Sequence, residues 1–473
     1  MNKPKLEFDD IQGLLARGYA ELPESCYIML QFGSRQGAKE WLAGIAGRIS
    51  TAAVKESSTA RQIAFTYPGM AALIDATKLR QPFSREFTDG MTTPERQRIL
   101  GDLGYNATTE WDWGADRQDE VHAVLMLYAK DCDALQHEYE SETAAFAGHG
   151  IKEIIRLDTN SECPDHKEHF GFADGLSQPK ISGFEGLGGS KARKEPAPYH
   201  VVKPGEFILG YGNEYDKQPF SPVYDDGKAK MDIGRNGSYM VFRQLEQRVK
   251  EFWTFIYDVA KANIHFADKD PVYIASKMVG RFPNGNPLAV IDSADKPALD
   301  GDAANDFLYK KQDADGFGCP VGAHIRKSHP RDGMDEDPEL SLTQTKRHRI
   351  LRRGRSYGAP LDKSMQPDKM LASTNTGNRG LYFICFNANI ARQFEFIQQA
   401  WDNNPKFGSL DYDVDPIIGY TYMEGAYTPG SFTIPDCPVR RKMHGIPQFV
   451  FVKGGAYFFM PGIAALKFIS GVG

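Results

Sequence analysis

Hydrophobic and polar positions alternate along the first third of the chain in a way that predicts short strands and longer helices. The strands are runs of β-branched and aromatic residues between turn residues, at 27–32, 62–67, 122–128 and 151–157. Apolar residues recur at three- and four-residue steps over two segments, which predicts amphipathic helices at 36–49 and 132–146. The resulting βαββαβ order is typical of a ferredoxin-like α+β unit, with an antiparallel sheet and helices on one face.

A second set with the same order follows later in the chain. We expect strands at 239–245 and 381–386, helices at 247–261 and 391–402, and a final hairpin of 448–452 and 456–460 around Gly454 and Gly455. A long insertion, rich in Asp, Pro and Gly and expected to form loops, runs from about 268 to 347. We therefore predict two ferredoxin-like units of the dimeric α/β barrel type, with domains at 1–180 and 181–473.

Composition and charge narrow the functional classes. The 473 residues are 41% hydrophobic, and 62 acidic against 56 basic residues give a net charge of −6. A balance of this sign argues against nucleic acid or another polyanion as a partner. The start of the chain shows no leader, and the most apolar region, 449–469, is interrupted by Lys453, Pro461 and Lys467. We expect a cytoplasmic protein that does not span a membrane.

The cysteines restrict the redox and metal chemistry. The six cysteines are scattered with no C-x-x-C pair, which favours reduced thiols over disulfides or a zinc knuckle. C-x-x-C-H is also absent, so haem attached covalently in the c-type manner is excluded.

The segment GFADG at 171–175 is a candidate for acid/base chemistry. Its glycines permit a tight turn, and aromatic neighbours can remove water from the carboxylate of Asp174. Such an aspartate could carry a proton between two atoms of a substrate. An ordinary surface turn at Asp174 and Gly175 agrees equally well with these residues, and local sequence does not separate the two interpretations.

Two later segments concentrate histidine and arginine. In CPVGAHIRKSHPR at 319–331, an extended backbone would point His324 and Arg326 to the same side. That arrangement suits an imidazole on a metal and a guanidinium against a carboxylate, although a core histidine beside a surface arginine fits as well. In RILRRGRSYG at 349–358, one arginine of a strand could point inward, where it needs an anion or a site of developing charge.

Taken together, these segments resemble the dye-decolorizing haem peroxidases, particularly the branch with longer chains. The three motifs occur in the order and spacing of that family. Further similar segments are DIQG at 10–13, FRQLEQ at 242–247 and QFEFIQ at 393–398. The resemblance covers nearly the whole chain. It implies two ferredoxin-like halves, with haem b bound in the C-terminal half and its long loop insertion.

The resemblance also implies roles on the proximal side of the haem. His324 resembles the proximal ligand, whose neutral imidazole binds the iron and makes it the one metal-ligating residue. Arg326 is expected to face a haem propionate. Glu395 is the candidate to accept the other ring proton of His324, which would increase the anionic character of the imidazole and favour oxidised iron.

On the distal side, Asp174 resembles the acid/base residue of the GxxDG motif and Arg352 aligns with the distal arginine. Leu381 and Phe383 look like the apolar lining of the distal pocket, although packing alone also explains buried residues of this kind. Gly354 departs from the Arg-Asp-Asn pattern of some relatives, so no distal asparagine is expected at that position.

The implied activity is that of a haem peroxidase. Hydrogen peroxide is reduced to water, and bulky aromatic donors such as dyes and phenols are oxidised in one-electron steps through a ferryl porphyrin radical. The alternative is a haem-binding or iron-release protein of the same fold with little turnover. It would need His324 and Arg326 but not the pair Asp174 and Arg352. The resemblance leaves a homo-oligomer open.

Two other sites compete on local sequence. The segment DHKEH at 165–169 places two histidines three residues apart, as in some mononuclear metal sites. It lacks H-E-x-x-H, and it continues directly into glycine-rich turns. The run GLGGSK at 186–191 contains the glycines of a phosphate loop but not its Lys-Ser/Thr ending or preceding strand, so a plain loop is expected.

Overall fold

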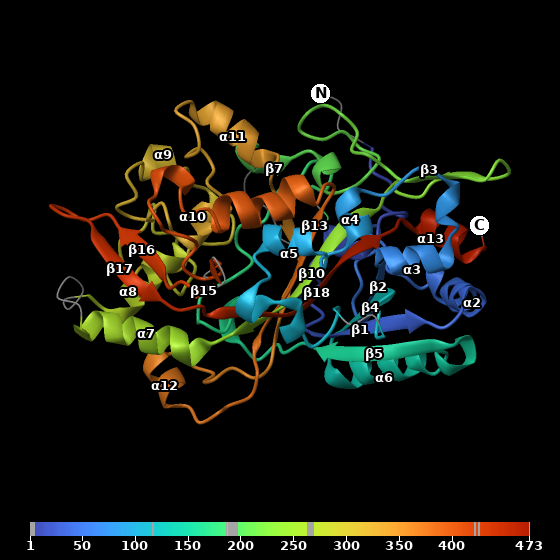
Figure 1. The fold of residues 1–473 in the computed structure, drawn as a ribbon, viewed down its shortest axis with the longest axis horizontal. Helices are drawn as coiled ribbons and strands as arrows, with labels where there is room; N and C mark the ends of the chain where they lie inside the picture. Colours follow the sequence, from blue (N-terminus) through green and yellow to red (C-terminus); the bar gives the residue numbers. More distant parts are fainter. Residues whose placement is uncertain are drawn as a thin grey trace.

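One large antiparallel sheet takes strands from both halves of the chain (Figure 1). The structure is a computed structural model that describes residues 5–115, 118–185, 187, 197–262, 269–420, 422–423 and 426–472. Nine strands form the sheet, and β12 (Arg355–Tyr357) pairs with β13 off the main path. The main path is β11 (Leu351–Arg352), β13 (Gly380–Asn387), β10 (Ser238–Gln247), β18 (Val450–Met460), β2 (Thr59–Phe65), β4 (Ala123–Ala129), β1 (Glu24–Phe32) and β5 (Ile151–Asp158).

The first four-stranded part of this sheet confirms the ferredoxin-like order predicted for the N-terminal third. Its strands lie in the order β5, β1, β4, β2, and the crossovers are the helices α2 (Arg35–Ala46) and α6 (Cys132–Thr143). Ser34 and Asp131 cap these helices by accepting backbone N–H bonds from the first turn. Trp41 and Leu42 of α2 are buried in the core on this face of the sheet, as the helical spacing predicts.

The second part repeats the order as β11, β13, β10, β18. Helix α7 (Val249–Ala262) follows β10, and the helix after β13 consists of two π-helical segments, Ala391–Glu395 and Ile397–Asp402. The predicted strands and helices of this half are therefore present, except for the final hairpin. The predicted boundary between the domains, at 180 and 181, stays a prediction, because the two parts share one sheet.

The sheet curls so that strands far apart in its order meet face to face. Tyr27 of β1 contacts Tyr382 of β13 and Phe242 of β10, with ring centroids 5.7 and 5.4 Å apart in edge-to-face geometry. These aromatic rings belong to one buried core shared by both halves. Edge-to-face pairs of this kind add to the stabilisation by burial. The fold agrees with the predicted barrel-like association of two ferredoxin-like units.

The two parts join at β18 and β2, where Phe459 is paired with Phe65. Beside this joint lies Gln12 of the DIQG segment, which is fully buried. Its side-chain amide donates to the carbonyl oxygens of Ile63 and Pro461, both at 2.9 Å, and its oxygen accepts from the Ile63 N–H at 3.0 Å. One buried amide thus satisfies backbone groups from both halves, which explains this motif structurally.

The insertion between α7 and β11 contains helices as well as the expected loops. They are α8 (Pro271–Val279), α9 (Tyr309–Gln312), α10 (His324–Ser328) and α11 (Pro338–Lys346). Short elements complete the structure: α1 (Gly13–Ala16), α3 (Tyr67–Leu73), α4 (Arg85–Asp89), α5 (Pro94–Leu100), α12 (Pro367–Ala372), α13 (Ile463–Ser470), β3 (Leu79–Gln81), β6 (Lys180–Ile181), β7 (Val201–Val202), β8 (Val223–Asp225), β9 (Lys230–Asp232), β14 (Tyr422–Met423), β15 (Ala426–Tyr427), β16 (Gly430–Ile434) and β17 (Arg441–Ile446).

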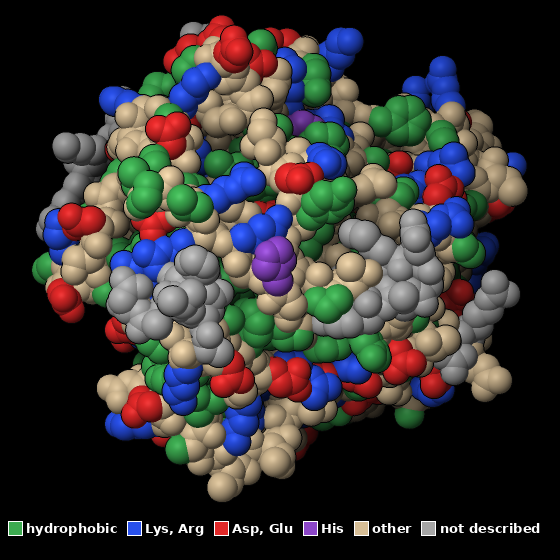
Figure 2. Space-filling view, turned by 60° about the vertical axis from the view of Figure 1, so that its left-hand side comes forward, with side chains coloured by type: hydrophobic (Ala, Val, Ile, Leu, Met, Phe, Trp, Pro, Cys, Tyr) green, Lys and Arg blue, Asp and Glu red, His purple; other side chains and the backbone are tan. Residues whose placement is uncertain are grey.

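Figure 2 shows one face of the molecule, on which acidic and basic side chains are interspersed. This mixture reflects the near balance of 62 acidic and 56 basic residues in the sequence. Among the described residues, no helix has both the length and the apolar character that crossing a membrane requires. Most of the phosphate-loop candidate at 186–191 lies outside the described residues.

The predicted hairpin around Gly454 and Gly455 is wrong, because β18 continues through both glycines. It pairs with β10 along its whole length, with a register shift opposite Gln244 and Leu245. The glycines serve close approach rather than a turn. A Cβ atom at Gly454 would lie 2.4 Å from Nε1 of the buried Trp113. Glycine in a strand is a signal for a turn or for a close neighbour, and only the packing separates the two.

Gly454→Ala should therefore lower the free energy of unfolding by about 1–3 kcal/mol, the usual cost of overpacking a core. Denaturant unfolding monitored by tryptophan fluorescence measures this change. Gly44→Ala is the matched control, because a Cβ atom there meets nothing within 4 Å and the residue lies in α2. That change should be neutral or stabilising. Equal stability of Gly454→Ala and the wild type would contradict the packing account.

Candidate active site

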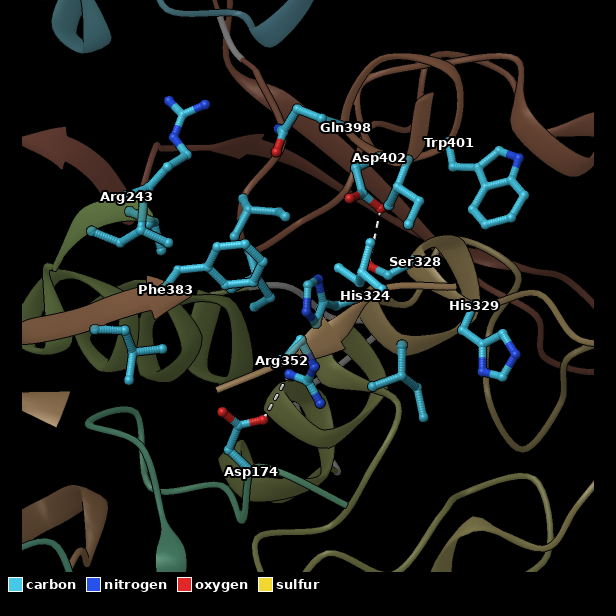
Figure 3. A pocket seen from close by; sticks show the side chains of 18 of the residues that line it. Asp174, Arg243, His324, Ser328, His329, Arg352, Phe383, Gln398, Trp401 and Asp402 are labelled. Carbon is cyan, nitrogen blue, oxygen red and sulfur yellow. Dashed lines mark hydrogen bonds and ion pairs between the residues drawn. The ribbon is translucent and has the colours of Figure 1, made fainter. Parts of the chain in front are cut away.

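A deep cleft opens between the second part of the sheet, the 171–175 loop and helix α10 (Figure 3). Its volume is about 1900 Å³ when the part open to solvent is counted. On the sheet side, Leu245 of β10 and Leu381 and Phe383 of β13 form part of an apolar wall. Leu381 and Phe383 thus line this cleft, and their place on the distal side of a haem stays a prediction. Register explains their position in the wall, since Leu245 pairs with Leu381 and alternate residues of a strand face the same side.

Asp174 and Arg352 meet in this cleft although 178 positions separate them. Nη1 of Arg352 donates to Oδ1 of Asp174 at 2.9 Å, as Figure 3 shows. Arg352 lies on the short strand β11, and its backbone N–H donates to Oε1 of Gln178 at 3.1 Å. The side chains remain 43% (Asp174) and 29% (Arg352) exposed, which leaves them accessible from the cleft. The structure thus brings together the two residues that the sequence proposed as a distal pair.

The loop that carries Asp174 is closed by the partly buried side chain of Glu168. Glu168 accepts backbone N–H bonds from Phe170 at 2.9 Å and Phe172 at 3.0 Å, and a third bond at 2.6 Å from the side-chain amide of Gln247. The backbone N–H of Asp174 donates to the backbone carbonyl oxygen of His166 at 3.0 Å. The GFADG segment is therefore a braced loop at the cleft and not a free surface turn.

Electrostatics keep Asp174 ionised. Burial raises the pKa of its carboxyl group, but the Arg352 guanidinium and the backbone N–H of Gly175 lower it by more, and the net pKa lies below the ordinary value of 3.8. At neutral pH the side chain is a carboxylate that can accept a proton, held next to a fixed positive charge.

His324 lies on another side of the same cleft as the first residue of α10. Its Nδ1 is 2.8 Å from Oδ2 of Asp415, a side chain with no solvent exposure. The other oxygen of Asp415 accepts the backbone N–H groups of Ile417 and Ile418, at 2.8 and 2.9 Å. Asp415 is thereby held as a carboxylate, so Nδ1 of His324 carries the shared proton and Nε2 is left for a ligand.

Glu395, predicted as the partner of His324, forms other contacts. It accepts from Nη1 of Arg96 at 2.7 Å and from the Tyr457 hydroxyl at 2.8 Å. These contacts connect the second half to helix α5 of the first half. The prediction is corrected to Asp415, which comes from a loop 91 positions after His324. A loop aspartate has no local pattern that marks it as a histidine partner.

Arg326 also departs from its predicted role at a propionate. It is buried with its guanidinium turned into the preceding loop, where it donates to the carbonyl oxygens of Asp313, Ala314 and Cys319. The reason is local, because the segment after Ala323 is helical rather than extended. In a helix, residues two positions apart face different sides, so Arg326 points away from the cleft that His324 faces.

Other cations, which the sequence did not single out as a group, line the cleft. Arg281 and Arg349 are 4% and 6% exposed, and neither forms an ion pair with a carboxylate among the described residues. Nη1 of Arg281 donates to the carbonyl oxygens of Gly285 and Ala304, and its Nη2 has no hydrogen-bond partner among the described residues. The guanidinium of Arg349 donates to the ring of His329 and to the carbonyl oxygen of Ser177. Burial and repulsion from neighbouring arginines lower the pKa of Arg281 to about 10 and of Arg349 to about 9.

Buried cations without an anion are costly, so this part of the cleft suits a ligand that carries negative charge. Together with the apolar wall and an available imidazole nitrogen, it matches the chemistry of a haem, which has an apolar ring, propionates and an iron that accepts a histidine. The residues present therefore fit this cofactor.

The competing metal site at 165–169 is not formed. His169 is buried, with Nε2 at 2.8 Å from the carbonyl oxygen of Tyr357 and Nδ1 at 3.7 Å from the Cys163 sulfur. Across the described part of the chain, no three His, Cys, Asp or Glu side chains are grouped to hold a metal ion.

Comparison with known proteins identifies the family. Residues 311–425 match the family "Dyp-type peroxidase, C-terminal". The multifunctional dye peroxidase DyP2 of Amycolatopsis sp. is 30% identical over 93% of this chain and 91% of its own length. The chain belongs to the dye-decolorizing peroxidase family. The dye-decolorizing peroxidase AauDyP1 of Auricularia auricula-judae is 32% identical over 73% of this chain, which spans 65% of that relative's length.

Solved structures agree with the sequence comparison. A dye-decolorizing peroxidase in complex with 2,6-dimethoxyphenol superposes with a TM-score of 0.78 at 25% identity, over 98% of this chain and all of that one. This peroxidase therefore has the fold of its family along nearly its whole length. Peroxidases of this family are haem enzymes, which agrees with the fit of the cleft.

The contact between His324 and Asp415 predicts a shifted titration in the haem-free chain. Burial lowers the pKa of His324, but the Asp415 carboxylate raises it to about 9. The protonated imidazole thus stabilises the haem-free fold fully below about pH 6.5, and this contribution is lost as the pH rises through about 9. Asp415→Asn should lower the pKa of His324 in an NMR titration, whereas Glu395→Gln should leave it unchanged. The reverse result would restore Glu395 as the partner.

Proposed function

We propose that this protein is a haem b peroxidase that reduces hydrogen peroxide to water and oxidises bulky aromatic donors such as dyes and phenols. The observation that carries the proposal is the ion pair of Asp174 and Arg352 in the cleft that also contains His324. An ionised acid/base group, a fixed cation and an imidazole facing one cavity are the groups that peroxide reduction on a haem requires.

His324 is the residue that would bind the iron, through Nε2, with Asp415 holding Nδ1. Arg281 and Arg349 would neutralise the propionates, since both are buried in the cleft without a carboxylate partner among the described residues. Leu381 and Phe383 would contact the apolar ring. When bound, haem supplies an iron centre that takes up peroxide and accepts and returns electrons.

The chain's own residues supply the proton transfer. The Asp174 carboxylate would accept a proton from one peroxide oxygen and return it to the other oxygen, which would leave as water. Arg352 donates hydrogen bonds toward the negative charge that develops while the oxygen–oxygen bond breaks. The same guanidinium keeps the pKa of Asp174 below its ordinary value, so the acceptor is already ionised before peroxide arrives.

Aromatic donors are proposed because of the family. Its members carry names that refer to dyes, and one solved structure contains 2,6-dimethoxyphenol. Trp401 and Tyr420 line the cleft, whereas Tyr357 and Tyr382 pack on the other face of the sheet. No single aromatic residue is assigned as an electron relay. A cytoplasmic location and a homo-oligomer stay predictions of the sequence.

The alternative of a haem-binding or iron-release protein needs His324 and the cations but not a distal acid/base pair. The ion pair of Asp174 and Arg352 favours the peroxidase, because holding a porphyrin does not require an ionised carboxylate facing the cavity. The two functions are separated by kinetics with peroxide.

His324→Ala should lose or loosen haem, because the change removes the only iron ligand assigned here. The purified protein, with hemin supplied, should show a Soret band that shifts on adding peroxide, and the variant should lack the histidine-bound spectrum. His137→Ala, at an exposed position on α6, is the control and should behave as the wild type. A wild-type protein that stays colourless with hemin, or a variant with an unchanged spectrum, would contradict the proposal.

Asp174→Asn should keep the haem spectrum and slow the reaction with peroxide by about 10²- to 10⁴-fold, the usual contribution of a positioned acid/base group. Stopped-flow absorption measures the bimolecular rate constant. Asp133→Asn, exposed on α6, controls for the loss of one negative charge. Unchanged kinetics in Asp174→Asn would remove the assigned role and favour the haem-binding alternative.

A further inference from the structure

A lysine side chain is fully buried one helical turn after His324. Lys327 is 0% exposed, and its Nζ donates to the carbonyl oxygens of Asn404 at 3.0 Å and Asp413 at 3.2 Å. The ammonium also lies 4.9 Å from the ring centroid of Phe407. Because His324 and Lys327 are three positions apart in α10, they face the same side of this helix.

The side that Lys327 faces contains a cluster of buried carboxyl groups. Asp402, Asp413 and Asp415 are 2%, 0% and 2% exposed. Asp402 accepts from the Ser328 hydroxyl at 3.0 Å, and the backbone N–H of Asp415 donates to the Asp402 carbonyl oxygen at 2.8 Å. Oδ1 of Asp413 accepts from the Ser431 hydroxyl at 2.6 Å and lies 3.4 Å from Nζ of Lys442, whereas Asp415 is bonded to His324.

The buried carboxyl groups differ in their protonation. Burial and the neighbouring Asp415 raise the pKa of Asp402 to about 8, so this group holds a proton at neutral pH. Asp415 stays ionised, because His324 and two backbone N–H groups lower its pKa against the effect of burial. For Lys327, burial lowers the pKa, and Asp415 is the first of three aspartates that oppose this effect. Nζ of Lys327 is bonded to the carbonyl oxygen of Asp413, two positions before Asp415, which places the ammonium beside the loop that carries Asp415.

We propose that Lys327 is a positioning residue whose positive charge acts through Asp415 to limit the anionic character of His324 and so to raise the reduction potential of the bound iron. The inference rests on the proposed function. A cation near Asp415 weakens the pull of that carboxylate on the Nδ1 proton of His324, and the imidazole then donates less charge to the iron. The same cation favours the reduced iron directly, because reduction removes a positive charge nearby. Both effects have the same sign.

A purely structural role would give a different result. Lys327 also ties α10 to the loop around Asn404 and Asp413 through its two carbonyl bonds. If these bonds were its whole contribution, a neutral donor would serve as well, and the potential would not depend on charge. Variants that change the charge and the hydrogen bonding separately distinguish the two roles.

The test is a spectroelectrochemical titration of the ferric/ferrous midpoint potential in the haem-loaded protein. Lys327→Gln, which keeps an N–H donor but loses the charge, and Lys327→Met, which loses both, should shift the midpoint to lower potential. Lys327→Arg, which keeps the charge, should stay near the wild type. Asp415→Asn should shift it in the opposite direction. Lys406→Met is the matched control, because Lys406 is 65% exposed and pairs with Asp411 at the surface, and it should leave the midpoint unchanged.

The outcomes separate this inference from the proposed function. A wild type that takes up no haem overturns both. A wild type with histidine-bound haem and unchanged midpoints in the Gln and Met variants overturns the role of Lys327 alone, as does a shift to higher potential. If Lys327→Met does not fold, Lys327→Gln and Lys327→Arg still decide the sign of the effect.

Discussion

The hydrogen bond between Nδ1 of His324 and Oδ2 of Asp415 is the interaction on which the site depends. It holds Nδ1 of the imidazole and leaves Nε2 for the iron ligation proposed above. The bond is possible because α10 begins at His324 and because two backbone N–H groups hold Asp415 as a carboxylate. This partner fixes the direction and raises the basicity of the imidazole, which are the properties that the proposed iron ligand needs.

The other interactions follow from charge buried around one cavity. Asp174 is neutralised by Arg352, whereas Arg281 and Arg349 are left without a carboxylate partner among the described residues. The cleft therefore contains two ion pairs, Asp174 with Arg352 and Asp102 with Arg243, beside two arginines that lack a carboxylate partner. The pair of Asp174 and Arg352 holds a carboxylate beside a cation, and the charge of the two arginines suits the carboxylates of the proposed haem.

Much of the fold could be predicted because its signals are local. Periodicities of two and of three to four residues mark β1, α2, β4, α6, β10 and β13 within a few residues of their observed ends. The predictions that were wrong concern residues whose conformation depends on a neighbour distant in sequence. Gly454 permits the approach of Trp113 rather than a turn, and the short helix α10 replaces an extended segment in a loop-rich insertion.

The sequence by itself determined the two ferredoxin-like units, the family, and the presence of His324, Asp174 and Arg352, because strand order and motif chemistry depend on residues close together in the chain. Only the tertiary structure decided that Asp415 rather than Glu395 bonds to His324, and that Arg281 and Arg349 rather than Arg326 line the cleft. The physical reason is that the packing of segments far apart in sequence determines which groups surround a buried charge. No local sequence pattern shows which of these segments meet.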